Sequence, residues 1–410
     1  MLKLINVAIS FIVMLFTNIG VIGSLLILYI REIYRLETIT PIAVSFTIGG
    51  MLSAISMPIA GHVYDKKGPR VMLSFTASCT LLWGLCMYLM GKTGSWSHAM
   101  IAWYFAWAFQ GFAFPFVVMS INPVLMMTFP DRRGLVISIT QSAQALSMAF
   151  WPYMLRHMAQ VLGFFNALAT IGVLNALILM FASALHNRLN GYAKPSGHEK
   201  ASALPGNQRR VTGLITVFLM IFFIAMSSMI IMSFFAGILE DLFQGPGKHI
   251  TDVNGTLIPL IMSLTGLLQA LMAMPWGILI DKIGPFKTIP ATYMAETLST
   301  FLAFITYTSN PWITSVFIVM RYVFFTGEPV AHWTLIPLIF GIENFGLISG
   351  TLNSAPIASS IIAPLLGGLI KDITGSYRAL LILSTGLSLL AFSVYGIKLR
   401  ELMSTRSATE

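Results

Sequence analysis

Charged residues are scarce in this chain. Asp, Glu, Lys and Arg together make up 10% of its 410 residues, while hydrophobic residues make up 56%. A soluble globular domain carries about 25% charged residues, so this composition excludes an ordinary water-soluble fold. We expect the chain to be solvated mainly by lipid.

Cysteine and catalytic motifs are also nearly absent. The two cysteines, Cys79 and Cys86, lie seven positions apart on one predicted helix and cannot bridge each other within it. A buried free cysteine behaves as a small hydrophobe. The sequence has no metal-ligand spacing, no Gly-rich phosphate loop and no Ser/His/Asp grouping. We therefore expect a protein that is not an enzyme and that binds no metal or cofactor.

Long apolar runs dominate the sequence instead. A helix needs roughly 20 apolar residues to cross the hydrocarbon core of a bilayer. Runs of this length exclude a β-barrel, whose strands are about ten residues of weak alternation. The prediction is an all-α membrane protein with twelve transmembrane segments, at about 4–30, 41–64, 71–91, 98–127, 134–156, 160–185, 211–238, 254–280, 288–308, 311–341, 346–370 and 377–398.

The net charge of +9 is explained by topology rather than by a nucleic-acid partner. If both termini are cytoplasmic, 16 Lys and Arg residues lie on the cytoplasmic side and seven on the outer side. This asymmetry is the positive-inside rule. We expect a multi-pass protein of the cell membrane with both termini in the cytoplasm and no nucleic-acid partner.

Two stretches of the chain are repeated. GHVYDKKGPR at 61–70 and GILIDKIGPFK at 277–287 share Gly, Asp, Gly and Pro at a fixed offset of 216 positions. A second pair, 134–152 and 346–364, matches at an offset of 212, with Gly, Leu, Ser and Pro repeated and Gln141 over Asn353. The chain therefore contains two copies of one unit.

The repeats define the expected domains. A polar stretch rich in Gly, Pro, Lys and Arg at 186–210 separates an N-terminal six-helix bundle, 1–185, from a C-terminal bundle, 211–400. We interpret the stretch as a cytoplasmic linker and 401–410 as a C-terminal tail. Two homologous halves around a midplane site are the architecture of alternating-access transporters, in which one half rocks against the other.

The repeated loop resembles the signature loop of the major facilitator superfamily, and the likeness covers the whole chain. Three stretches are similar to the monocarboxylate transporters and the oxalate–formate antiporter group: GPR ending at Arg70, FPDRRGLVISI at 129–139 leading to Pro152, and APLLGGLIKDITGSY at 363–377. The resemblance implies a monomeric transporter with a carboxylate-binding arginine just before Gly277. The sequence has Ala273 and Met274 there instead.

Charged residues of the repeated loops are candidates for a cytoplasmic gate. Asp65 and Asp281 sit beside basic residues that include Arg70 and Lys287. A carboxylate can accept charge-assisted hydrogen bonds from the N-terminus of a neighbouring helix. We expect the four residues to hold the cytoplasmic side closed in an outward-open state. The alternative is that their charges only determine the orientation of the chain in the membrane.

The segment 319–341 carries the most informative ionisable residues. Arg321 is the only basic residue placed inside the membrane, and Glu328 and His332 follow it on the same helix. At about 100° per residue, the three fall on a single stripe, which is expected to face the bundle interior or a watery cavity because charge in lipid is costly. Glu328 is the expected proton carrier and His332 its relay. Arg321 is expected to bind an anionic substrate or to neutralise Glu328. The alternative is a purely structural role, in which the stripe forms an ion pair or polar contact with neighbouring helices.

Other polar residues lie within the apolar segments. Glu296 is interpreted as structural, since it has no cation on its own predicted helix. Single amides on the helices that the resemblance places around a cavity could bind substrate or another helix: Asn18, Gln110, Asn122, Gln141, Gln269 and Asn353. Gln141 and Asn353 rank first because they are equivalent in the two halves.

Three functions compete. The first is a proton-coupled symporter of a small organic anion, most simply a monocarboxylate. The second is a proton-antiport exporter of a cationic or amphipathic compound, although the segment at 134–156 lacks the central Gly-Pro pattern of such exporters. The third is a membrane sensor or scaffold without a transport cycle. Transport of another solute, such as an amino acid or another neutral metabolite, also remains open.

Overall fold

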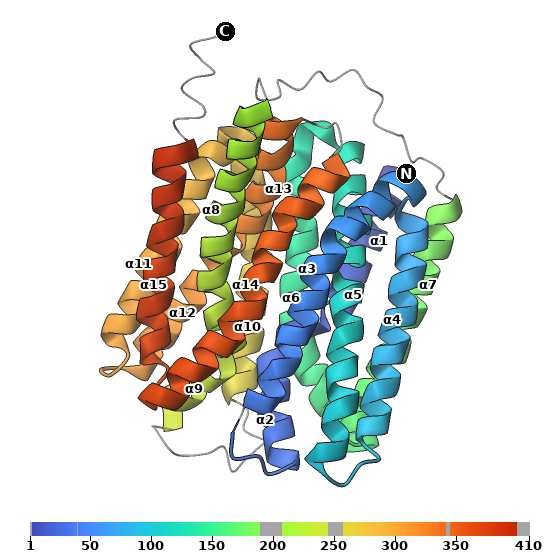
Figure 1. The fold of residues 1–410 in the computed structure, drawn as a ribbon, viewed down its shortest axis with the longest axis vertical. Coiled ribbons are helices and arrows are strands. Elements are labelled where there is room, and N and C mark those ends of the chain that lie inside the picture. The colour runs from blue at the N-terminus through green and yellow to red at the C-terminus, as the bar shows by residue number, and fades with distance from the viewer. Residues whose placement is uncertain (1, 39, 189–206, 245–256, 342–344, 400–410) are drawn as a thin grey trace.

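The computed structural model describes residues 2–38, 40–188, 207–244, 257–341 and 345–399, and these residues are almost entirely helical (Figure 1). Most of the predicted linker and the predicted tail lie outside the described residues. The first half contains α1 (Leu2–Thr17), η1 (Ile19–Ile22), α2 (Gly23–Ile33), α3 (Thr40–Lys67), α4 (Pro69–Met90), α5 (Trp96–Thr128), η2 (Pro130–Arg132), α6 (Arg133–Leu162) and α7 (Phe164–Arg188). The second contains α8 (Asn207–Ser233), α9 (Phe235–Gln244), α10 (Leu257–Ile283), α11 (Pro285–Thr306), α12 (Pro311–Phe325), α13 (Gly327–Phe340), α14 (Phe345–Thr374), α15 (Arg378–Val394) and a π-helical turn, η3 (Tyr395–Leu399).

Each predicted apolar segment is occupied by helix, so the predicted all-α membrane fold is confirmed. Nine of the described helical stretches are long and apolar enough to cross a membrane, with α12 and α13 counted together. Three segments are interrupted: the first at Asn18, the seventh at Phe234 and the tenth at Thr326. The last interruption has a local cause, since Gly327 follows it and Pro329 has no N–H to donate back to the preceding turn.

The two halves pack against each other through two equivalent helix pairs, α3 with α14 and α6 with α10. Each pair crosses at a repeated glycine. A Cβ on Gly61 would collide with the Gly346 carbonyl oxygen, and one on Gly277 would lie 2.7 Å from the Gly134 carbonyl oxygen. Small residues let membrane helices approach closely. The repeated glycines therefore meet each other across the interface.

The apolar core is shared at one end of the molecule and divided at the other. We call the end where α1 begins and α15 finishes the terminal end, and the opposite one the distal end (Figure 1). One cluster joins both halves, from Tyr64 and Val136 to Ile280 and Leu352. Toward the distal end, a second cluster belongs to the first half alone, and a third belongs to the second half apart from Met148. The halves are thus joined at the terminal end and separable at the distal end.

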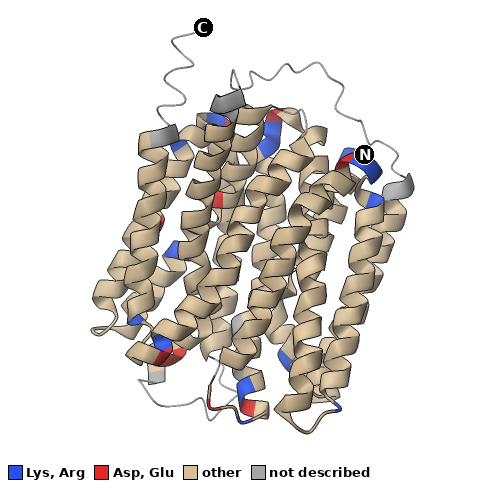
Figure 2. Cartoon of the chain, viewed as in Figure 1, with Lys and Arg blue, Asp and Glu red and all other residues tan. Residues whose placement is uncertain are grey.

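Charged side chains are also distributed unevenly along the bundle, from the terminal end to the distal end. Figure 2 shows Lys, Arg, Asp and Glu gathered at the two ends of the bundle, with few between them. The buried ionisable residues between the ends include Arg321, Glu296 and Glu328, at 1%, 0% and 3% exposure.

Candidate functional site

A cavity of about 220 Å³ lies between the two halves, on the distal side of their shared core. Both halves contribute to its wall: Asn18, Gly20, Gly23, Ile27, Ala43, Phe46, Gly49, Gly50, Ser53, Trp107, Gln110, Gly111 and Phe114 from the first, and Met229, Met232, Ser233, Phe234, Ser360 and Pro364 from the second. Among these described lining residues there is no acidic, basic or histidine side chain. The wall is therefore apolar with a few uncharged polar groups.

The cavity forms where two equivalent helices are interrupted. Asn18, at the break between α1 and η1, and Phe234, at the break between α8 and α9, both line it. These two positions are separated by 216 residues, the offset of the repeated loop. Discontinuous helices related by an internal repeat mark the binding sites of many transporters.

Glycines and aromatic rings shape the wall from the first half. A Cβ on Gly20 would meet nothing within 4 Å. Gly49 and Gly111 instead let α3 and α5 touch, since a Cβ on Gly49 would lie 2.9 Å from the Trp107 carbonyl oxygen. The rings of Phe46 and Trp107 lie beside each other with centroids 4.1 Å apart. The two rings are tilted by 56° to each other and form an aromatic wall beside a glycine-lined space.

Asn18 and Gln110 provide the polar side of the cavity. The Asn18 amide donates to the Gln144 carbonyl oxygen at 3.4 Å and to the Ser147 hydroxyl at 3.2 Å. Both residues also border a smaller adjoining void of about 10 Å³. Its polar lining further includes Thr17, Thr76, Thr80 and Gln144. A void of this size is at the lower limit for one water molecule.

At the terminal end, the loop carboxylates reach across to the opposite half. Asp281, at the end of α10, accepts from the Gly134 N–H at 2.8 Å and from the Leu135 N–H at 2.9 Å, at the start of α6. Asp65, at the end of α3, interacts with the backbone N–H of Leu347 at the start of α14. A helix N-terminus is a favourable place for a carboxylate. Arg70 and Lys287 are exposed at the same end.

At the distal end, two polar contacts join the halves. Arg31 of α2 lies 3.7 Å from Glu240 of α9, with side chains 22% and 12% exposed. The Thr40 hydroxyl donates to the Asp372 carboxylate at 3.4 Å. The cavity is therefore bracketed by contacts between the halves at both ends.

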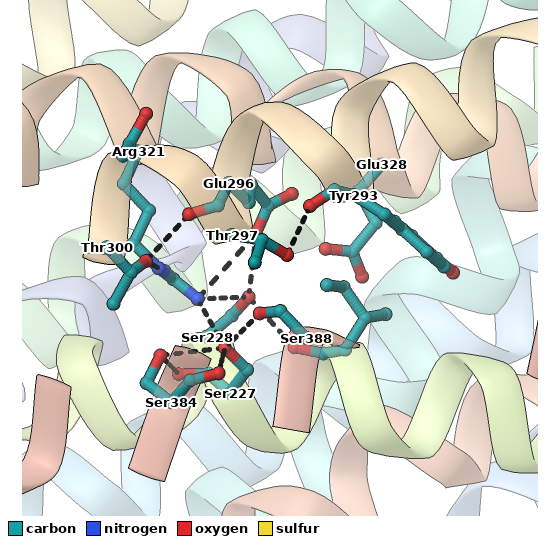
Figure 3. A network of polar contacts seen from close by, with 12 residues as sticks. Ser227, Ser228, Tyr293, Glu296, Thr297, Thr300, Arg321, Glu328, Ser384 and Ser388 are labelled. Carbon is teal, nitrogen blue, oxygen red and sulfur yellow. Dashed lines mark hydrogen bonds and ion pairs between the residues drawn. The ribbon is translucent and has the colours of Figure 1, made fainter. Parts of the chain in front are cut away.

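Arg321 is the centre of a buried polar network (Figure 3). Its Nη2 lies 3.6 Å from Oε2 of Glu296 on α11. Its Nε donates to the Thr300 hydroxyl at 2.8 Å. Nη2 also donates to the hydroxyls of Ser227 at 3.0 Å and Ser228 at 3.2 Å, both on α8. Arg321 thus ties three helices together.

Serine hydroxyls extend the network to α15. The Ser227 hydroxyl lies 2.7 Å from that of Ser384 and 2.6 Å from that of Ser388. Ser228 donates to Oε2 of Glu296 at 3.4 Å. The adjacent pair of serines in an otherwise apolar segment was the available sequence signal for these partners, and sequence reasoning missed it.

Glu328 and His332 occupy the next layer toward the terminal end. The His332 Nδ1 lies 3.8 Å from Oε1 of Glu328. The His332 Nε2 forms a hydrogen bond of 2.7 Å with the Tyr293 hydroxyl of α11. Glu328 and Glu296 are close enough to interact electrostatically. The stripe that the sequence predicts is buried in the second half and faces α11.

The network and the cavity lie on different faces of α8. Ser227 and Ser228 contact Arg321, whereas Met229, Met232 and Ser233 line the cavity. Arg321, Glu328 and His332 are not among the lining residues of the cavity. A solute in the cavity would therefore meet α8 before it could meet the ionisable groups.

The predicted amides are divided between the cavity and the protein interior. Asn18 and Gln110 line the cavity. Buried Asn122 accepts from Thr140 at 3.2 Å, and Gln269 donates to the Tyr322 carbonyl oxygen at 2.9 Å. The Asn353 amide donates to the Ser349 carbonyl oxygen of its own helix at 2.8 Å, and Gln141 is half-buried on α6.

The family of the chain follows from this architecture and from a direct comparison. A model of the Major Facilitator Superfamily matches residues 2–152 and 217–408, and the chain belongs to this family of membrane transporters. No curated protein is similar enough in sequence to count as a relative. The match establishes the family and does not identify the subgroup that the short motifs suggest.

Solved structures share the fold at low sequence identity. A bacterial homologue of the iron transporter ferroportin in an outward-facing state aligns with a TM-score of 0.71 and 14% identity over 97% of this chain and 99% of that chain. The same homologue with soaked iron aligns with a TM-score of 0.71 and 12% identity, over 95% and 98%. The human organic anion transporter MFSD10 (TETRAN) aligns with a TM-score of 0.68 and 14% identity, over 96% and 99%.

Proposed function

We propose that this chain is a proton-coupled secondary transporter, working as a monomer by alternating access, that moves a small uncharged or amphipathic organic solute. The observation that carries the choice of solute is the cavity wall, whose described residues include aromatic rings, methionines, glycines and single amides but no charged side chain. A full charge placed there without a partner would lose its hydration and gain nothing in return.

A small organic anion, such as a monocarboxylate, is the second candidate. Arg321 and the short motifs at 129–139 and 363–377 favour it. In the arrangement described, however, the Arg321 guanidinium is bonded to Glu296, Thr300, Ser227 and Ser228. An anion would have to displace Glu296 and reach past α8. For this reason the uncharged or amphipathic solute is preferred.

In the proposed cycle, Asp65 and Asp281 close the cytoplasmic side. Each carboxylate lies at the start of a helix of the other half, so a rocking motion of the halves must break both contacts together. Arg70 and Lys287 add positive charge at the same end, as the positive-inside rule favours. The terminal end of the molecule is then the cytoplasmic end.

Proton coupling is assigned to Glu328 and its neighbour His332. A carboxylate at 3% exposure is disfavoured in its charged form, and it can therefore take up and release a proton as its surroundings change. His332 is its proposed relay, because its Nδ1 lies 3.8 Å from Glu328 and its Nε2 forms a 2.7 Å hydrogen bond with Tyr293.

Counterflow in proteoliposomes tests the proposal. A panel of labelled acids, amines and neutral aromatic compounds would be offered while internal pH is recorded. Saturable exchange of an uncharged or amphipathic compound is expected, and exchange restricted to carboxylates would favour the second candidate. The Glu328→Gln variant should lose accumulation driven by a pH gradient while it keeps exchange. Accumulation that survives in this variant would remove Glu328 from coupling.

A further inference from the structure

The buried network contains two carboxyl groups, Glu296 and Glu328, but only one side chain with a permanent positive charge, Arg321. Arg321, Glu296 and Glu328 are all 3% exposed or less. One guanidinium can neutralise only one carboxylate, and a second ionised carboxylate in the same dry interior would be left uncompensated. Such a charge is strongly disfavoured, and the usual outcome is that the group binds a proton.

The geometry shows which of the two carboxylates is in contact with the cation. Arg321 contacts Glu296 at 3.6 Å, and its other close partners are the hydroxyls of Thr300, Ser227 and Ser228. Oε1 of Glu328 instead lies 3.8 Å from Nδ1 of His332, which is too long for a hydrogen bond.

Unused hydrogen-bonding capacity marks the same place. Oε1 of Glu296 and Oε2 of Glu328 are buried and have no hydrogen-bond partner among the described residues. The two side chains interact electrostatically across the gap between α11 and α13. Two repelling carboxylates with free oxygens are stabilised by a proton placed between them.

We infer that Glu296 and Glu328 hold one proton between them, and that Glu296 is therefore a proton-binding residue and not only a structural partner of Arg321. The groups that face this pair are Arg321 on α12, Ser228 on α8, Tyr293 and Thr300 on α11, His332 on α13 and, through Tyr293, Tyr395 of η3. Among these groups, only Arg321 carries a permanent charge.

The position of the pair gives the proton a site of its own, separate from the solute. Arg321 holds α8 through Ser227 and Ser228, and the residues that follow them on this helix, Met229 and Met232, line the cavity. Proton gain or loss at the pair changes how tightly Glu296 holds Arg321, and Arg321 passes that change to α8. This use in coupling rests on the transport function proposed above; the occupancy of the proton site does not.

Infrared spectroscopy of the purified full chain tests the occupancy without any solute. The measurement is the carbonyl stretch of a protonated carboxylic acid at neutral pH, assigned by difference between wild type and variants. Wild type should show one buried acid. Glu296→Gln and Glu328→Gln should each lose it, because either remaining carboxylate is neutralised by Arg321. Both variants are electrically balanced and should fold. Glu32→Gln, at an exposed position, should leave the signal unchanged.

Replacement of Arg321 tests the number of protonated carboxylic acids further. Arg321→Gln should show two buried acids, and the double variant Glu296→Gln/Arg321→Gln should show one. Absence of the acid in wild type would overturn the inference and place the proton on His332. A signal that survives in either single glutamate variant would also overturn it, because one residue would then hold the proton alone. Acid signals without solute counterflow would leave the proton site standing and remove the proposed transport function.

Discussion

The two halves of the molecule use equivalent helices in different ways. In α5 the prolines Pro115 and Pro123 match Pro329 and Pro337 of α13 at an offset of 214 positions. At the same offset, Trp107 corresponds to Arg321 and Phe114 to Glu328. The first half presents its aromatic residues to the cavity, whereas the second half buries its ionisable residues against α11.

The difference shows how a duplicated backbone can divide two tasks. The prolines stand at equivalent positions in both segments, whereas the side chains around them are aromatic beside the cavity and ionisable in the polar network. In the second half, the break at Thr326 turns the chain between Arg321 and Glu328. The four predictions below test the comparison between the halves, beginning with the largest expected effect.

Replacement of Arg321 is expected to have the largest effect on stability. Arg321→Met leaves two buried carboxylates without a cation, and loss of one partner of a buried pair costs about 3–5 kcal/mol. Thermal unfolding in detergent, followed by tryptophan fluorescence, measures the loss. The loss should grow as pH rises, because the folded variant must hold more protons than the unfolded chain and stability then falls with pH.

Arg31→Met is the matched control. Its partner Glu240 and its own side chain are partly exposed, at 12% and 22%, and such an ion pair contributes about 1 kcal/mol or less. Equal losses in the two variants would contradict the special role given to the second half.

Gly134→Ala tests the contact between the halves at the terminal end. A Cβ there would lie 2.6 Å from the Asp281 carboxylate and 2.7 Å from the Gly277 carbonyl oxygen. Overpacking of this kind costs about 1–3 kcal/mol, and separation of the halves relieves it. Separation can be measured with the Ser138→Cys variant in a background without Cys79 and Cys86. This buried cysteine should react faster with a thiol reagent when Gly134→Ala is also present than when Gly134 is retained. Gly20→Ala, where a Cβ meets nothing within 4 Å, should not change the rate.

The two latch carboxylates should be equivalent. Asp65→Asn and Asp281→Asn each keep an acceptor oxygen but lose charge assistance, which roughly halves the strength of a hydrogen bond. Each variant should raise the Ser138→Cys labelling rate several-fold, and the double variant should exceed both. Asp131→Asn, exposed at the same end, serves as the control. A clear inequality between the two single variants would show that the halves do not share the gate.

Gln110→Leu should have the smallest effect, limited to solute binding. Loss of one neutral hydrogen bond costs about 1 kcal/mol, or roughly a fivefold weaker affinity, measured by the half-saturation of counterflow. Asn353→Leu is the matched control, because the Asn353 amide is bonded within its own helix. An equal effect in both variants would show that the loss of affinity is not specific to the side chains that line the cavity.

Much of the fold could be predicted from the sequence. Apolar length alone located the membrane-crossing segments, and fixed offsets between short motifs revealed the duplication. Two of the three helix breaks could not be predicted. Thr326 precedes Gly327 and Pro329, but Asn18 and Phe234 have no proline beside them. The proline rule that accounts for the break at Thr326 therefore does not predict these two breaks.

The candidate site was less predictable. Helical periodicity placed Arg321, Glu328 and His332 on one stripe, but it could not show which neighbour the stripe faces. Glu296 precedes Arg321 by 25 positions on a different helix, and only the packing of α11 against α12 brings the two to 3.6 Å. The repeat ranks Gln141 and Asn353 first among the amides, but of these three it is Gln110 that lines the cavity, while Asn353 is bonded within its own helix.

The placement of α8 between the cavity and the ionisable groups has an evolutionary consequence. Under the proposed function, substitutions at Phe46, Gln110 or Met232 would alter which compound fits without touching Glu296 or Glu328, the proposed proton-binding residues. Related transporters could then differ in their solutes while they keep the same proposed proton site. The repeated loop motif would indicate common ancestry and not the identity of the solute.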